Sequence, residues 1–157
     1  MSSDFQCVAA PAESFSAFFE LNPEQLEARG ARRMTVDQNP GVPCRVSLED
    51  AALGEQVILL PFKYHDVDSP YQASGPVFVR ETATQARHLV NELPQMLKHR
   101  LLSVRAYDGG NDMISADVVP GNNLAAAIRD LLADPGVAYL HLHNARQGCY
   151  LCAVARA

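Results

Sequence analysis

Hydrophobic and polar residues alternate along the C-terminal third of the chain, and this alternation predicts two β-hairpins. Residues 101–107 (LLSVRAY) and 113–119 (MISADVV) flank the turn sequence DGGND. Residues 137–143 (VAYLHLH) and 149–155 (CYLCAVA) form a second pair around a polar turn. Alternation with a period of two on both sides of a turn-forming segment is a strong local indication of a hairpin.

Between the two hairpins, the spacing of apolar residues changes to that of a helix. Asn122 or Asn123 can cap its first turn. The apolar positions follow an i, i+3, i+4, i+7, i+8 stripe, made of Leu124, Ala127, Ile128, Leu131 and Leu132. The order strand-strand-helix-strand-strand predicts an α+β fold. We expect its four strands to join one antiparallel sheet with the helix packed on one face.

The first hundred residues predict shorter elements. Residues 5–9 read as a short strand, and Asn22 precedes a short helix that Gly30 would end. Residues 32–36 and 76–81 are further strand candidates. Residues 55–64 carry apolar side chains on both faces, which is typical of a central strand.

Two segments of this region lack a clear period. Residues 65–76 contain two prolines and a glycine, so we expect a loop, and such loops often carry binding groups. Residues 84–101 are predicted to be partly helical and interrupted at Pro94.

Alternation also sorts the side chains of the predicted sheet between its faces. The apolar face should hold Ile114, Ala116 and Val118 beside the residues that meet the helix. The opposite face should then carry Arg105, Tyr107, Asp117, His141 and His143. That face can be an idle solvent-exposed surface or a partly covered pocket. Its Arg, Tyr and His content differs from the Lys, Glu and Thr of an idle face.

The stretch HLHNARQGCYLC (141–152) resembles four metal ligands in a row. With a four-residue turn, His143 lies opposite Tyr150 and His141 opposite Cys152, while Cys149 points to the core. With a five-residue turn, His143 meets Cys149 and Cys152 changes face. Neither register brings both cysteines to both histidines, and the CYLC segment lacks the tight turn of a zinc site. We therefore expect no metal at this hairpin.

Composition limits the classes of protein to which the chain can belong. Its 157 residues, 48% hydrophobic, are enough for one globular domain spanning 1–157. A net charge of −5 argues against a nucleic-acid partner. No apolar run approaches the length of a membrane span, and the first fifteen residues contain no Lys or Arg of a secretory signal. These features predict a cytoplasmic protein with four free thiols.

Eleven of the thirteen basic residues are arginines. This bias reflects either codon usage or the recognition of anions by bidentate guanidinium groups. Cys44 beside Arg45 reads either as a nucleophilic thiol or as a small buried side chain.

Several irregular motifs occur in the order found in a known family. PCRVSLEDAALGE, SPYQASGPVFVRE, LLSVRAYD, ADVV and AYLHLHNARQGCY resemble the bacterial family catalogued as domain of unknown function 1203. The resemblance covers about residues 40–157 and leaves 1–39 as an N-terminal extension. It carries no assigned function. It implies that the family pattern includes Cys44, Arg45, Tyr71, Ser74, Gly75, Pro76, Arg80, Glu81, Arg105, Tyr107, His143, Asn144, Arg146, Gly148, Cys149 and Tyr150.

From these patterns we expect a small anionic molecule to bind in a pocket on the polar sheet face, lined by Arg, Tyr and His. The candidate ligand-binding residues are Arg45, Tyr71, Ser74, Arg80, Arg105, Tyr107, His143, Asn144 and Arg146. One alternative is a module whose polar face docks a protein partner. Another is an enzyme that uses Cys44, His141 or His143. No cofactor is implied, and a homo-oligomer stays possible.

Overall fold

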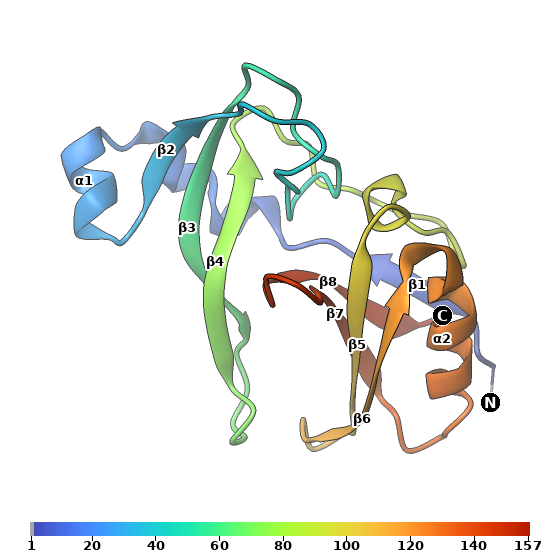
Figure 1. Ribbon diagram of the computed structural model, residues 1–157. Coiled ribbons are helices and arrows are strands. Elements are labelled where there is room, and N and C mark those ends of the chain that lie inside the picture. Colours follow the sequence, from blue (N-terminus) through green and yellow to red (C-terminus); the bar gives the residue numbers. More distant parts are fainter. Residues whose placement is uncertain (1) are drawn as a thin grey trace.

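Eight strands form two antiparallel sheets in the computed structural model, which describes residues 2–157 (Figure 1). The larger sheet has the order β1-β8-β7-β5-β6, and the smaller one has the order β2-β3-β4. The strands of the larger sheet are β1 (Phe5–Val8), β5 (Leu101–Tyr107), β6 (Met113–Pro120), β7 (Tyr139–Asn144) and β8 (Tyr150–Arg156). Those of the smaller sheet are β2 (Arg32–Thr35), β3 (Gln56–His65) and β4 (Ala73–Arg80).

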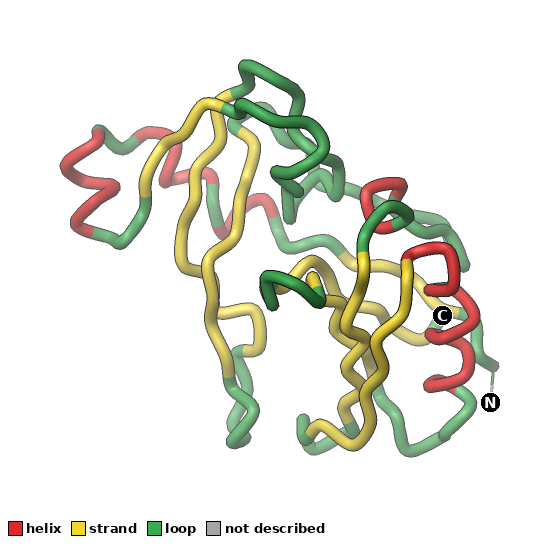
Figure 2. The backbone as a smooth tube through the Cα atoms, viewed as in Figure 1, coloured by secondary structure: helices red, strands yellow, loops and turns green. Residues whose placement is uncertain are grey.

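Helices are short and few (Figure 2). The α-helices are α1 (Pro23–Ala28) and α2 (Leu124–Leu132), and the 3-10 turns are η1 (Ala12–Ser14), η2 (Ser16–Glu20), η3 (Gln95–Leu97) and η4 (Gly121–Asn123). The predicted helix after Asn22 is confirmed, and Asn22 and Gln25 form a capping box at its start by exchanging side-chain to backbone hydrogen bonds. At α2 the expected asparagine cap is absent, since η4 leads directly into the helix and Asn123 makes no capping bond.

The predicted C-terminal unit is confirmed, because both hairpins lie in the five-stranded sheet and β5 pairs with β7. Helix α2 covers one face of that sheet (Figure 1). Leu124, Ile128 and Leu132 lie in one buried cluster with side chains such as Leu102 and Leu140. This is the burial that the apolar stripe of α2 predicts.

The β3–β4 hairpin packs on the opposite side of the five-stranded sheet from α2 (Figure 1). Strand β3 is central in its own sheet, as its two apolar faces predict. A second buried cluster joins it to the N-terminal region, where the Phe15 and Phe62 rings meet edge to face at 5.1 Å. The larger sheet therefore lies between α2 and the β3–β4 hairpin.

Two predictions for the upstream half need correction. Residues 84–101, predicted to be partly helical, form the 3-10 turn Gln95–Leu97 and otherwise follow an irregular path until β5 begins at Leu101. The predicted loop 65–76 is shorter, because β4 begins at Ala73 and pairs with His65 across a bulge. In both cases the prolines are tolerated at a strand edge or before a turn, where no backbone donor is required.

The predicted facing of β6 is wrong from Ser115 onward. Tyr107 pairs with Met113, as a five-residue turn requires, but Ala106 pairs with Ser115, so Ile114 is a bulge residue. A shift of one residue moves every later side chain to the other face. Asp117 consequently lies opposite Val104 rather than beside Arg105, and Ala116 takes that place.

A second bulge corrects the prediction for the last strand. The four-residue turn is confirmed, since Asn144 and Cys149 pair at its base and His143 lies opposite Tyr150. Leu142 then pairs with Cys152, so Leu151 is the extra residue. Leu151 and Cys152 both enter the core, and Ala153 lies opposite His141 in place of the predicted cysteine.

Candidate functional site

The polar face of the large sheet carries rows of aromatic and basic side chains. Arg105 pairs with His141, Ser103 with His143, and Tyr107 with Tyr139. Directly opposed residues share a face, so the predicted grouping of Arg105, Tyr107, His141 and His143 is confirmed.

Strand β3 covers this face with two further side chains. Tyr64 stacks on Tyr150 at 4.8 Å between ring centroids and meets His143 edge to face at 5.2 Å. His65 lies 4.4 Å from the Tyr107 ring and 4.9 Å from His141. We call this interior the aromatic layer, which consists of Tyr64, His65, Tyr107, Tyr139, His141, His143 and Tyr150.

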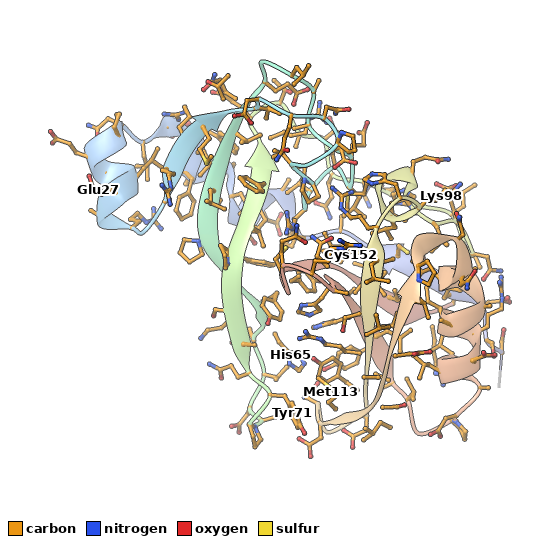
Figure 3. All side chains as sticks on the ribbon, viewed as in Figure 1. Glu27, His65, Tyr71, Lys98, Met113 and Cys152 are labelled. Atoms are coloured by element: carbon orange, nitrogen blue, oxygen red, sulfur yellow. The ribbon has the colours of Figure 1, made fainter. Side chains whose placement is uncertain are left out.

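A hydrogen-bonded chain closes one end of the aromatic layer. His65 Nε2 lies 2.6 Å from the Tyr139 hydroxyl, which donates to Asn111 Oδ1 at 2.8 Å. His65 Nδ1 lies 2.8 Å from the Tyr71 carbonyl oxygen. Figure 3 shows His65 and Tyr71 at the end of the β3–β4 hairpin that lies nearest Met113. These bonds tie that hairpin to the β5–β6 turn.

Two histidines in the aromatic layer have a ring nitrogen without a partner. Among residues 2–157, nothing bonds His141 Nδ1 or His143 Nε2, and both atoms are buried. Burial lowers the pKa of His141 to about 3 and that of His143 to about 4. Both rings are therefore neutral at physiological pH.

Most side chains of the aromatic layer are buried, and only Tyr64 and Tyr139 are partly exposed. Tyr107, His141 and His143 are 3%, 4% and 0% exposed. Side chains buried to this degree cannot present the open docking face considered above, and a ligand would have to separate the sheets to reach them. Arg105 is only half-buried and donates to the Ser103 hydroxyl at 3.2 Å.

An open cavity of about 280 Å³ lies at the β7–β8 turn, where the large sheet meets the segment before β3. We call it the Arg45 cavity. Three predicted residues, Arg45, Asn144 and Arg146, line it. The remaining lining residues are Gly41, Pro43, Phe78, His99, Arg100, Leu101, Gln147 and Cys149.

Arg45 is buried in the wall of this cavity without a carboxylate partner. The side chain is 1% exposed. Its Nε donates to the Tyr150 carbonyl at 2.7 Å, and its Nη1 donates to the Pro43 carbonyl. Within residues 2–157, no acidic side chain lies in ion-pair range of it. Burial lowers the pKa of the Arg45 guanidinium, and the neighbouring Cys149 opposes that change.

Cys149 and Asn144 form the adjoining wall. Cys149 is half-buried rather than in the core, because it lies in the turn before β8 begins at Tyr150. Asn144 Nδ2 donates to Cys149 Sγ at 3.1 Å. Arg146 is exposed at the turn. The Cys149 thiol, the Asn144 amide and the guanidinium groups of Arg45 and Arg146 therefore border the same space.

The far wall holds a cation whose charge is already paired. Arg100 donates to both carboxylate oxygens of Asp50, and His99 Nε2 lies 2.8 Å from Asp50 Oδ2. A second cavity of about 750 Å³ lies on the other side of His99 and is lined by Asp50 and Glu49 as well as by Arg87 and His88. Its mixture of charges indicates no preference for one sign of ligand.

The other predicted residues lie apart from the Arg45 cavity. Cys44 is fully buried, and its Sγ accepts backbone N–H groups from Ser47 and Arg80. Arg80 forms a bidentate ion pair with Glu55 at 2.6 and 2.8 Å. Tyr71 and Ser74 are exposed on the β3–β4 hairpin. The set of residues predicted from the sequence therefore includes three that line the Arg45 cavity and others that lie elsewhere in the structure.

Sequence reasoning missed residues in both places. Tyr64 and His65 belong to the aromatic layer. They are the last residues of β3, and the sequence does not show that β3 packs against the five-stranded sheet. His99 and Arg100 line the cavity from a segment with no usable period. One signal in the sequence could have pointed to this layer. Phe62 and Tyr64 are two residues apart, as are His141 and His143, and residues with this spacing in a strand lie on the same face.

Metal binding finds no support in this geometry. Among residues 2–157, no three His, Cys, Asp or Glu side chains are grouped to hold a metal ion. The HLHNARQGCYLC stretch is divided, with the histidines in the aromatic layer, Cys149 at the cavity and Cys152 in the core beside Cys7. The described residues also form no helix with the length and apolar character needed to cross a membrane.

These features define an α+β protein of two packed antiparallel sheets with a basic cavity at their junction. Residues 41–156 match the family model described as protein of unknown function (DUF1203), so the chain belongs to that family. No curated protein and no solved structure matches the chain. Every residue that lines the Arg45 cavity falls within the matched segment.

Proposed function

We propose that the protein binds a small anionic molecule in the Arg45 cavity. The observation that carries the proposal is the buried guanidinium of Arg45, which has no carboxylate partner within residues 2–157. A buried charge is costly unless an opposite charge or strong hydrogen bonds compensate it. An anion in the cavity would supply that charge.

The other lining groups favour a carboxylate or phosphate. Arg146 adds a second guanidinium at the open side, and Asn144 adds an amide. Guanidinium groups bind both classes of oxyanion through paired N–H donors. A volume of about 280 Å³ suits a compact ligand, since ligand pockets commonly begin near ~300 Å³.

This placement moves the predicted pocket away from the centre of the polar sheet face. Arg45, Asn144 and Arg146 stay in the candidate set. His143 supports the cavity indirectly, because its ring contacts that of Tyr150, whose carbonyl accepts a hydrogen bond from Arg45. Tyr107 lies in the aromatic layer and does not line the cavity. Arg105, Arg80, Tyr71 and Ser74 lie outside the cavity.

Thermal unfolding in the presence of anions tests the proposal. Citrate and inorganic phosphate should raise the Tm relative to sodium chloride of equal ionic strength. An anion at a hundred times its Kd adds about 2.7 kcal/mol. For a chain of this size, that corresponds to a shift on the order of 5–10 °C.

Two variants locate the effect. Arg146→Ala removes an exposed cation at the cavity and should reduce the shift, whereas Arg32→Ala removes an exposed cation on β2 and should not. Equal shifts in both variants and in the wild type would place the anion elsewhere. No shift beyond the chloride control would refute binding of these anions.

A further inference from the structure

The four cysteines differ sharply in exposure. Cys7, Cys44 and Cys152 are 4%, 0% and 0% exposed, while Cys149 is half-buried at the Arg45 cavity. Thiol reagents in solution therefore meet one accessible sulfur in the folded protein. Exposure beside cationic groups is the setting in which protein thiols react selectively.

The contacts of Cys149 connect its sulfur to the anion site. Asn144 Nδ2 donates to Sγ at 3.1 Å, and Asn144 is itself 93% buried, so this donor is fixed in place. The Arg45 side chain lines the same cavity as Cys149, and its charge has no acidic partner in the described chain. The buried charge of Arg45 is an independent indication of a ligand. An anionic group bound to Arg45 would lie close to the Cys149 thiol, because both residues line the same cavity.

We propose that Cys149 accepts a mixed disulfide from an acidic, low-molecular-weight disulfide that binds in the Arg45 cavity. This inference rests on the proposed function and names the substrate class of that site. Arg45 and Arg146 would hold the carboxylates of the incoming molecule. Its sulfur–sulfur bond would then lie within reach of Cys149 Sγ.

The exchange balances without a further oxidant. Cys149 loses its proton to solvent, and the thiolate attacks one sulfur of the bound disulfide. A bond forms between that sulfur and Cys149 Sγ while the ligand's own disulfide bond breaks. The other half leaves as a thiolate and takes up a proton from water. Cys149 is oxidised, and the leaving half is reduced.

The charge of the disulfide distinguishes this reaction from that of an ordinary exposed thiol, because only a thiol beside a cationic site should prefer an anionic disulfide. Glutathione disulfide is anionic, bis(2-hydroxyethyl) disulfide is neutral and cystamine is cationic. Attraction by the two guanidinium groups should make the anionic reagent react faster than the neutral one, by at least about tenfold at low salt. Cystamine should react more slowly than the neutral reagent.

Intact-mass spectrometry of the native protein, followed by peptide mapping, measures these rates. The expected product carries one glutathione at Cys149, and Cys149→Ser should form none. Arg146→Ala should slow the reaction with glutathione disulfide but leave the rate with the neutral disulfide unchanged. Arg32→Ala, which changes net charge equally away from the cavity, should leave both rates unchanged.

The outcomes separate this inference from the proposal of anion binding. Equal rates for anionic and neutral disulfides, or modification of another cysteine in the folded protein, would overturn the inference. The citrate-induced Tm shift of the wild-type protein, measured with its thiols kept reduced, reads the anion site independently of the exchange reaction. If that shift persists while exchange shows no charge selectivity, anion binding stands and the disulfide reaction fails. If both are absent, both proposals fail.

Discussion

Arg45 donates its Nε–H to the backbone carbonyl of Tyr150 at 2.7 Å, across 105 positions of sequence. The Tyr150 ring stacks on Tyr64 in the aromatic layer, so Tyr150 connects the wall of the Arg45 cavity to the packing between the two sheets. A ligand that moves Arg45 would therefore act on the packing of β3 against β8.

Replacement of Arg45 by lysine should destabilise the protein by about 2–3 kcal/mol, because a single ammonium cannot reach both the Tyr150 and Pro43 carbonyls in the same geometry. Urea unfolding measures the loss. The matched change Arg146→Lys, at an exposed position, should stay within about 0.5 kcal/mol. Comparable losses at the two positions would contradict a structural role for the Arg45 bonds.

The buried histidines predict a loss of stability in mild acid. The folded-state pKa values of about 3 for His141 and about 4 for His143 lie below the ordinary value near 6.5. The unfolded chain therefore takes up protons below pH 6.5 that the folded chain does not. Stability is fully present above pH 6.5 and falls as the pH decreases toward 4, by up to about 1.4 kcal/mol per histidine per pH unit.

Unfolding free energies measured between pH 7 and 4.5, above most carboxylate titration, test this slope. His141→Gln should flatten it by about half, and the double variant with His143→Gln should remove most of the remainder. A double variant with an unchanged slope would assign the acid sensitivity to other groups.

The Tyr139 hydroxyl should contribute about 1–2 kcal/mol, because it joins His65 to Asn111. In Tyr139→Phe we expect faster hydrogen exchange at the tips of the β3–β4 and β5–β6 hairpins, measured by mass spectrometry. Tyr71→Phe is the matched control, since Tyr71 is 41% exposed and bonds His65 only through its backbone. Unchanged exchange at both tips in Tyr139→Phe would show that the hydroxyl does not hold them together.

Gly121 allows the start of α2 to approach η3 closely. A Cβ at this position would lie 2.1 Å from the Leu97 carbonyl oxygen and 2.7 Å from the Lys98 backbone. Gly121→Ala should therefore cost about 2–4 kcal/mol in thermal or urea unfolding, because backbone atoms must shift. Gly109→Ala, where a Cβ would meet nothing within 4 Å, should be nearly neutral. Equal stability of the two variants would contradict this close approach.

The elements of the C-terminal third could be predicted because each carries its own local pattern. The stripe of α2 and the alternation of β5 and β7 specify their buried faces, and the structure confirms them. The single-domain expectation and the individual site assignments stay predictions.

The facing of side chains in β6 and β8 could not be predicted, because each strand contains a single-residue bulge. Ile114 and Leu151 are apolar and occur within regular alternation, so nothing in the sequence marks them as extra residues. Each moved a predicted neighbour, Asp117 in one case and Cys152 in the other, to the opposite face. The Arg45 cavity was beyond local reasoning, because it joins segments from Gly41 to Cys149 that only the tertiary fold brings together.

The pairing of β1 with β8 also sets an order of events during synthesis. Phe5 and Cys7 are made about 150 residues before their strand partners Arg156 and Val154. The β2-β3-β4 sheet can form once residue 80 has emerged from the ribosome, but β1 cannot pair until residue 156 has emerged. During that interval the apolar side chains of β1 have no strand partner, and unpaired strands of this kind favour aggregation of incomplete chains.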